Sequence, residues 1–115
     1  MTDRDTPLVW LRGEIKTPPF SSEARVEAGV LLRRLQRGEK LGMPQSRPMP
    51  MVGAGAHELR VPDRTVTWRI LYHVAADAIV VLEVFQKKTR ATPKRVLEDA
   101  RRRLKAYLKV AKEDG

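Results

Sequence analysis

Apolar and polar residues alternate along three short segments in the middle of the chain, and this alternation limits the folds that the chain can adopt. Successive side chains of a β-strand point to opposite faces of its sheet, so alternation indicates a strand with one apolar face. Turn-forming residues at 62–64 and 75–77 leave only short connections, which predict an antiparallel meander. The three predicted strands are residues 57–61, 68–73 and 80–88.

Basic residues interrupt one face of these strands. In the second strand Trp68 and Ile70 share one face, whereas Arg69 and His73 share the other. Cations that converge on one sheet face repel one another unless a polyanion neutralises them, and nucleic acid is the common polyanion. We therefore interpret one face as a core and the other as an anion site. The net charge of +9 and the pI of about 10.5 agree with nucleic-acid binding, although a basic chain can also simply be more soluble.

Length and composition predict one domain, residues 1–115, with a single core. The chain has no cysteine, which excludes disulfides, thiolate metal sites and a cysteine nucleophile. No apolar run is long enough for a membrane span or a signal peptide. We therefore expect a cytoplasmic protein.

Signals for one further strand and one helix precede the meander. The apolar run at 8–11 predicts a first strand, or alternatively an extended arm. Ser21 or Ser22 can cap a helix that has Glu23 in its first turn and ends at Gly38. Its apolar stripe consists of Ala24, Ala28, Leu31, Leu32 and Leu35.

The remaining segments are a long loop and a second helix. Residues 39–56 contain three prolines and three glycines, which predict a loop whose methionines fill gaps over the core or contact a partner. Thr92 and Pro93 predict the start of a helix that continues to about Lys112. The element order predicts an α+β domain with its helices against one face of the sheet.

Four pieces of the sequence, taken together, resemble the RelE/ParE superfamily of toxins from bacterial type II toxin–antitoxin modules, and most closely its phage-derived HigB-like branch. Their order and spacing carry the resemblance over residues 10–107. The pieces are residues 14–21, 57–60, 68–72 and 82–89 followed by Pro93.

The resemblance implies a RelE-like fold: a twisted antiparallel sheet, a helical pair on one face, and a concave basic surface on the other. It implies an endoribonuclease that cuts messenger RNA in the ribosomal decoding site and needs no metal or cofactor. It also implies a helix-turn-helix antitoxin as partner, with no membrane or small-molecule ligand.

Cleavage by the 2′-hydroxyl of RNA requires a base, an acid and cations that stabilise the charge on the phosphorane. By resemblance, Arg69 and Lys88 match the basic groups of the family site, and His73 or His57 could move protons. The residues expected to contact RNA are Arg60, Lys87, Arg90 and Lys94.

One departure from the family leaves the general base unassigned. Related nucleases place a tyrosine or histidine near the start of the last helix, where this chain has Arg90, Ala91 and Thr92. Two other functions therefore remain open: a ParE-like toxin directed at gyrase, and a phage protein that binds nucleic acid without cutting it.

Overall fold

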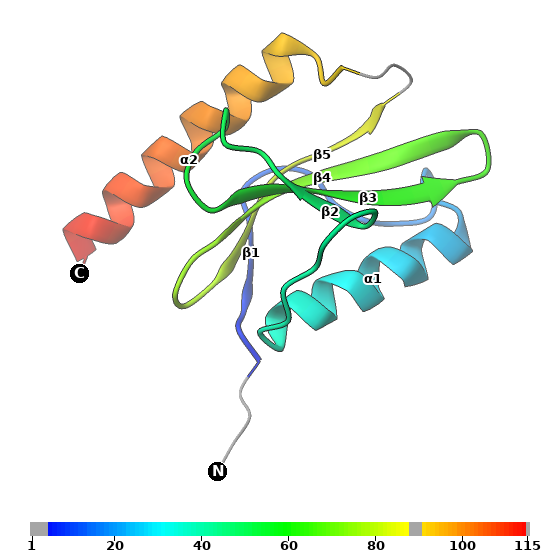
Figure 1. Ribbon diagram of the computed structural model, residues 1–115, viewed down its shortest axis with the longest axis horizontal. Helices are drawn as coiled ribbons and strands as arrows, with labels where there is room; N and C mark the ends of the chain where they lie inside the picture. Colours follow the sequence, from blue (N-terminus) through cyan, green and yellow to red (C-terminus); the bar gives the residue numbers. More distant parts are fainter. Residues whose placement is uncertain (1–4, 88–90, 115) are drawn as a thin grey trace.

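A five-stranded sheet with one helix on each face forms the part of the chain that the structure describes (Figure 1). The computed structural model describes residues 5–87 and 91–114. The strand order is β1-β5-β4-β3-β2, in which β1 runs parallel to β5 and all other neighbours are antiparallel. The elements are β1 Leu8–Trp10, α1 Ser22–Gln36, β2 Ser46–Pro48, β3 Ala56–Asp63, β4 Val66–Val74, β5 Ile79–Lys87 and α2 Lys94–Asp114.

The predicted α+β class and the three-strand meander are confirmed, but two details of the prediction were wrong. The sheet is mixed rather than antiparallel, because the first strand pairs in parallel with β5. The two helices cover opposite faces of the sheet rather than the same face. The physical reason is that β4 and β5 carry apolar residues on both faces, so each face needs a helix to exclude water.

Helix α1 forms where its capping and apolar signals predict it. The hydroxyl of Ser21 accepts a hydrogen bond from the backbone N–H of Ala24 at 3.0 Å, and Glu23 lies in the first turn. At the other end Gly38 has φ of +89°, the left-handed conformation that glycine adopts without steric cost. The predicted apolar stripe is buried against β3 and β4.

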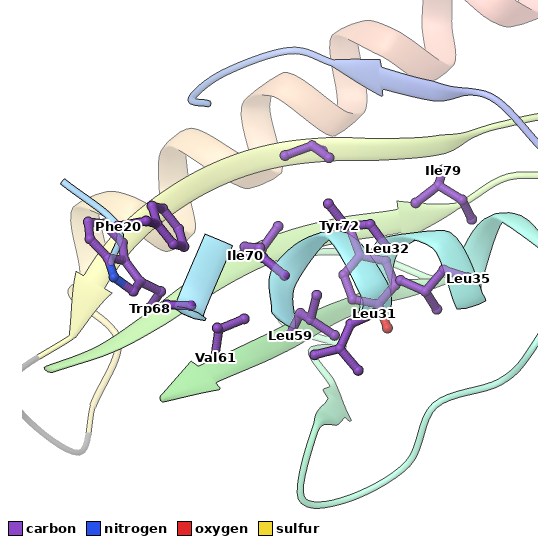
Figure 2. Packing of buried hydrophobic residues seen from close by; sticks show 13 residues of the cluster. Phe20, Leu31, Leu32, Leu35, Leu59, Val61, Trp68, Ile70, Tyr72 and Ile79 are labelled. Atoms are coloured by element: carbon purple, nitrogen blue, oxygen red, sulfur yellow. The ribbon is translucent and has the colours of Figure 1, made fainter. Parts of the chain in front are cut away.

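An aromatic stack and a carboxylate fasten the start of α1 to the sheet. Phe20 lies over Trp68 (Figure 2), and their ring centroids are 3.9 Å apart. Asp63 accepts hydrogen bonds from the backbone N–H of Ser21 at 2.9 Å and from Nε1 of Trp68 at 3.0 Å. These bonds lower the pKa of Asp63, the backbone bond from Ser21 most strongly.

A strand that the sequence did not predict lies within the proline-rich loop. β2 has three residues and pairs antiparallel with β3, with Arg47 opposite Glu58. It is an edge strand, so Pro48 can end it without removing a hydrogen bond from a central ladder. This strand brings Arg47 to the sheet.

Helix α2 covers the other face with Ala100 and Leu104, which pack on Leu71, Val80 and Leu82. Within the described ranges, no helix is both long and apolar enough to cross a membrane.

Candidate functional site

Two of the predicted cations lie side by side on the sheet face that α2 partly covers. Arg60 of β3 and Arg69 of β4 are directly paired across the antiparallel ladder. Residues that oppose each other in such a ladder point to the same face, with Cβ atoms about 4.5–5.5 Å apart. Phe85 of β5 flanks Arg69 on its other side. The sheet therefore brings together the two strand arginines that the sequence singled out.

A buried carboxylate organises these arginines. Glu58 of β3 is fully buried, and its Oε1 accepts hydrogen bonds from Nη1 of Arg69 at 3.1 Å and from Nε of Arg47 at 3.0 Å. Its Oε2 accepts one from the hydroxyl of Thr92 at 3.2 Å, just before α2 begins. We call Arg47, Glu58, Arg60, Arg69 and Thr92 the arginine cluster. Three strands and the approach to α2 therefore meet at one carboxylate.

The arginine cluster has a surplus of positive charge. Glu58 pairs with Arg47 and Arg69, and Arg60 lies opposite Arg69, so three arginines and one carboxylate leave a formal charge of +2 among these residues. Burial lowers the pKa of Arg69, and Arg60 and Arg47 lower it further, whereas Glu58 raises it. An arginine stays protonated in proteins, so Arg69 keeps its positive charge although its pKa is lowered.

Arg69 itself is only 8% exposed, and its buried Nε has no hydrogen-bond partner among the described residues. Arg60 and Arg47 are more accessible, because both are partly exposed. An incoming anion would therefore meet Arg47 and Arg60 first, with Arg69 beneath them. Charges in partly buried positions are screened less by salt than those on an open surface.

The structure describes two of the other four basic residues that the sequence singled out. Lys88 and Arg90 lie outside the described residues. Lys87 ends β5, where its backbone pairs with Thr67. Lys94 opens α2 as an exposed side chain, 4.0 Å from Glu98.

The two histidines do not join the arginine cluster. His57 lies on the opposite face of the sheet, where its ring stacks on Tyr72 with centroids 5.3 Å apart. His73 shares the face of Arg69 but lies four residues along β4, about 13 Å at the usual rise per residue. The core residue Leu71 lies between them.

His73 is enclosed rather than presented to a substrate. It is buried, and a Cβ atom added at Gly55 would lie 3.1 Å from its Cε1. Gly55 also has φ of +76°, so glycine is required here for both its conformation and its small size. Nδ1 of His73 is buried without a hydrogen-bond partner in the described part of the chain.

The enclosure of His73 predicts a pH-dependent stability. Burial lowers the pKa of His73 below its ordinary 6.5, because the folded protein disfavours the charged imidazolium. The unfolded chain therefore binds the proton more readily, and folding free energy is lost as the pH falls below about 6.5. We expect the melting temperature to fall between pH 7.5 and pH 5.5, and less steeply in a His73→Gln variant. Equal slopes for the two proteins in calorimetry would contradict this assignment.

Sequence reasoning missed three members of the arginine cluster, which are Arg47, Glu58 and Thr92. Glu58 stands between two residues of an alternating strand, and an acidic residue on the same face as Arg60 is the signal that could have identified it. Arg47 lies in a strand that was not predicted, and no local signal pairs it with Glu58. Thr92 was expected to cap α2, whereas its hydroxyl donates to Glu58.

A mixed five-stranded sheet between two helices is consistent with the RelE-like fold, the class to which the toxins of many toxin–antitoxin modules belong. Residues 18–105, more than half of the chain, match the model of the family described as "Phage derived protein Gp49-like (DUF891)". The chain belongs to this family, which consists of RelE-like toxins of toxin–antitoxin systems. The search of curated proteins found no match.

Proposed function

We propose that this protein is the toxin of a type II toxin–antitoxin module, in the HigB-like branch, and that it cleaves messenger RNA on the ribosome. The observation that carries the proposal is the arginine cluster, in which the guanidinium groups of Arg47 and Arg69 share one buried carboxylate and Arg60 lies opposite Arg69 on the same sheet face. A surplus of charge held in a fixed arrangement suits a phosphodiester better than it suits an uncharged partner. Because ribosomes are the proposed target, the protein would act in the cytoplasm.

In the proposed reaction the 2′-hydroxyl of RNA loses its proton to a base and its oxygen forms a bond to the adjacent phosphorus. The bond from phosphorus to the 5′-oxygen breaks, and the leaving oxygen takes up a proton from an acid. The products are a 2′,3′-cyclic phosphate and a free 5′-hydroxyl. Negative charge grows on the non-bridging oxygens, and Arg60, Arg47 and the charge of Arg69 would stabilise it. This requires neither a metal nor a cofactor.

Glu58 would act as a positioning residue in this reaction. It is fully buried and already accepts hydrogen bonds from Arg47, Arg69 and Thr92. These bonds fix the guanidinium planes before substrate arrives, so little reorganisation is needed during reaction. The described residues of the cluster thus supply charge stabilisation. For proton transfer, Lys88 is still proposed as the acid, and His57 and His73 lie too far from Arg69 to reach the same phosphate directly.

A ParE-like toxin directed at gyrase is the second candidate function. It would act by protein binding and would not require cations gathered around a buried carboxylate. The arginine cluster therefore favours a toxin that acts on RNA over a toxin directed at gyrase. A protein that binds nucleic acid without cutting it would use the same charges. For the ribonuclease and for the gyrase-directed toxin alike, the proposed partner is a helix-turn-helix antitoxin.

Replacing Arg60 tests the proposed function with little risk to the fold, because its side chain is partly exposed. We expect Arg60→Ala to cut ribosome-bound messenger RNA about 10 to 100 times more slowly, because a hydrogen bond to a charged group is worth about 1.5–3 kcal/mol. Lys105→Ala, which removes an exposed charge from α2, should cleave like the wild type. The measurement is the mapping of RNA 5′ ends after addition of purified toxin to translating ribosomes.

Two other results would identify the alternatives. Wild-type toxin that leaves RNA intact but blocks DNA supercoiling by gyrase would support the ParE-like function. Wild-type toxin that binds RNA with no new 5′ ends and no growth arrest would support the non-catalytic binding function.

A further inference from the structure

A groove separates the edge strand β1 from helix α1, on the sheet face opposite the arginine cluster. Its volume is about 730 Å³. Leu8, Trp10, Ile15 and Leu32 give it apolar walls, and Gly29 of α1 lines it without a side chain. A groove of this volume can accept several side chains of a peptide segment.

Large apolar side chains at the end of β1 remain exposed at this groove. Trp10, which lines the groove, is 41% exposed, and Leu11, the next residue, is 36% exposed. An exposed tryptophan that lines a groove is typical of a protein interface rather than of a surface that stays in water.

The outer edge of β1 can accept another strand. β1 is the last strand of the sheet, and no strand of the described chain lies beyond it. The backbone N–H of Leu11 donates to Val81, and the carbonyl of Pro7 accepts from Ile79, so these residues face β5. Leu8 and Trp10 alternate with them and direct their backbone groups to the open edge.

The charge around the groove indicates an acidic occupant. Arg25, Arg33 and Glu14 line the groove. Arg33 pairs with Asp5 at 3.1 Å and Glu14 pairs with Lys16 at 2.9 Å, so these five residues leave a formal charge of +1 at the groove. The chain carries a net charge of +9, so a second copy of it would be repelled. Nucleic acid would find the apolar walls of the groove unfavourable, and the arginine cluster lies on the other face.

We propose that this groove holds an acidic, amphipathic segment of the cognate antitoxin, which adds a strand beside β1 and inserts apolar side chains between Trp10 and Leu32. Backbone hydrogen bonds along the edge would give affinity, and the groove would select the side chains. The inference rests on the toxin–antitoxin part of the proposed function and is independent of its ribonuclease part.

Gly29 offers a direct test, because a Cβ atom added there meets nothing within 4 Å. Gly29→Trp should fill the groove without disturbing the core, and Gly29→Ala is the matched control that adds only a methyl group. Both replacements raise helix propensity, so neither should unfold α1. The probe is the purified product of the reading frame that adjoins this gene, and binding is measured by calorimetry.

We expect the adjoining protein to bind the wild type and Gly29→Ala equally, and to bind Gly29→Trp at least 100 times more weakly. Cleavage of RNA by Gly29→Trp should stay at the wild-type level, so a failure of the ribonuclease proposal remains distinguishable. Arg25→Glu should also weaken binding, and more than Lys109→Glu, which makes the same charge change on α2.

Three results would overturn the inference. The first is binding of Gly29→Trp at wild-type affinity, or no binding of the adjoining protein to the wild type. The second is a wild-type dimer that dissociates in Gly29→Trp, which would assign the groove to a second copy of the chain. The third is loss of RNA binding in Gly29→Trp with antitoxin binding unchanged, which would assign the groove to nucleic acid.

Discussion

The Glu58→Ala variant should lose about 3–5 kcal/mol of folding free energy, the largest effect on stability that we expect from a single polar replacement here. Glu58 is fully buried, and its removal leaves the guanidinium of Arg69, which is 8% exposed, without its counter-charge. The hydroxyl of Thr92 and Nε of Arg47 lose their acceptor as well. Urea unfolding, followed by circular dichroism, measures the change.

Glu83→Ala is the matched control for this prediction. Glu83 also lies on the sheet and pairs with an arginine, Arg103, at 3.2 Å, but both members of this pair are more exposed than Glu58 and Arg69. We expect its removal to cost about 1 kcal/mol, because a partly solvated arginine tolerates the loss of its partner. Equal losses in Glu58→Ala and Glu83→Ala would show that burial of Glu58 carries no special penalty.

If the protein cleaves RNA as proposed, the Arg69→Met variant should cleave it about 100-fold or more slowly and should no longer arrest growth. The reason is the removal of a charge beneath the proposed phosphate position, where solvent screens charges poorly. The variant also leaves Glu58 buried with one charged partner fewer, so it should be destabilised too. Activity is measured by mapping RNA ends, as for Arg60→Ala.

A double variant separates loss of charge from loss of fold. Glu58→Gln combined with Arg69→Met removes both charges of the buried pair. The glutamine oxygen can still accept a hydrogen bond from Arg47, and its NH2 group can donate one to the hydroxyl of Thr92. We expect it to regain most of the stability while remaining inactive. Recovery of cleavage in the double variant would contradict a role for the Arg69 charge.

Most of the fold could be predicted because local signals and tertiary packing agree. Alternation located β3, β4 and β5, and the Ser21 cap with Gly38 bounded α1. β2 was missed because three residues beside a proline carry no periodicity, and only pairing with β3 makes them a strand. The opposite placement of the helices follows from the second apolar face of β4 and β5, which the arginine on β4 obscured.

The site was harder to predict than the fold, because alternation gives the face of a side chain but not its depth or its partner. It placed Arg60 and Arg69 on one face, and the register pairs them. It could also have placed His57 with Leu59 and Val61 on the α1 face, where the structure has it. The burial of Arg69 against Glu58 depends on contacts that link three strands, so no single segment of sequence contains that information.

The two tryptophans of the chain occupy contrasting environments, so the fluorescence of Trp10 can report on binding at the groove. Trp68 lies beneath Phe20 and is 5% exposed, whereas the indole of Trp10 opens to solvent at the groove. In a Trp68→Phe variant the remaining fluorescence would come from Trp10 alone. Acrylamide would quench that emission in the isolated toxin, and a segment seated beside β1 would shield it and shift its maximum to shorter wavelength.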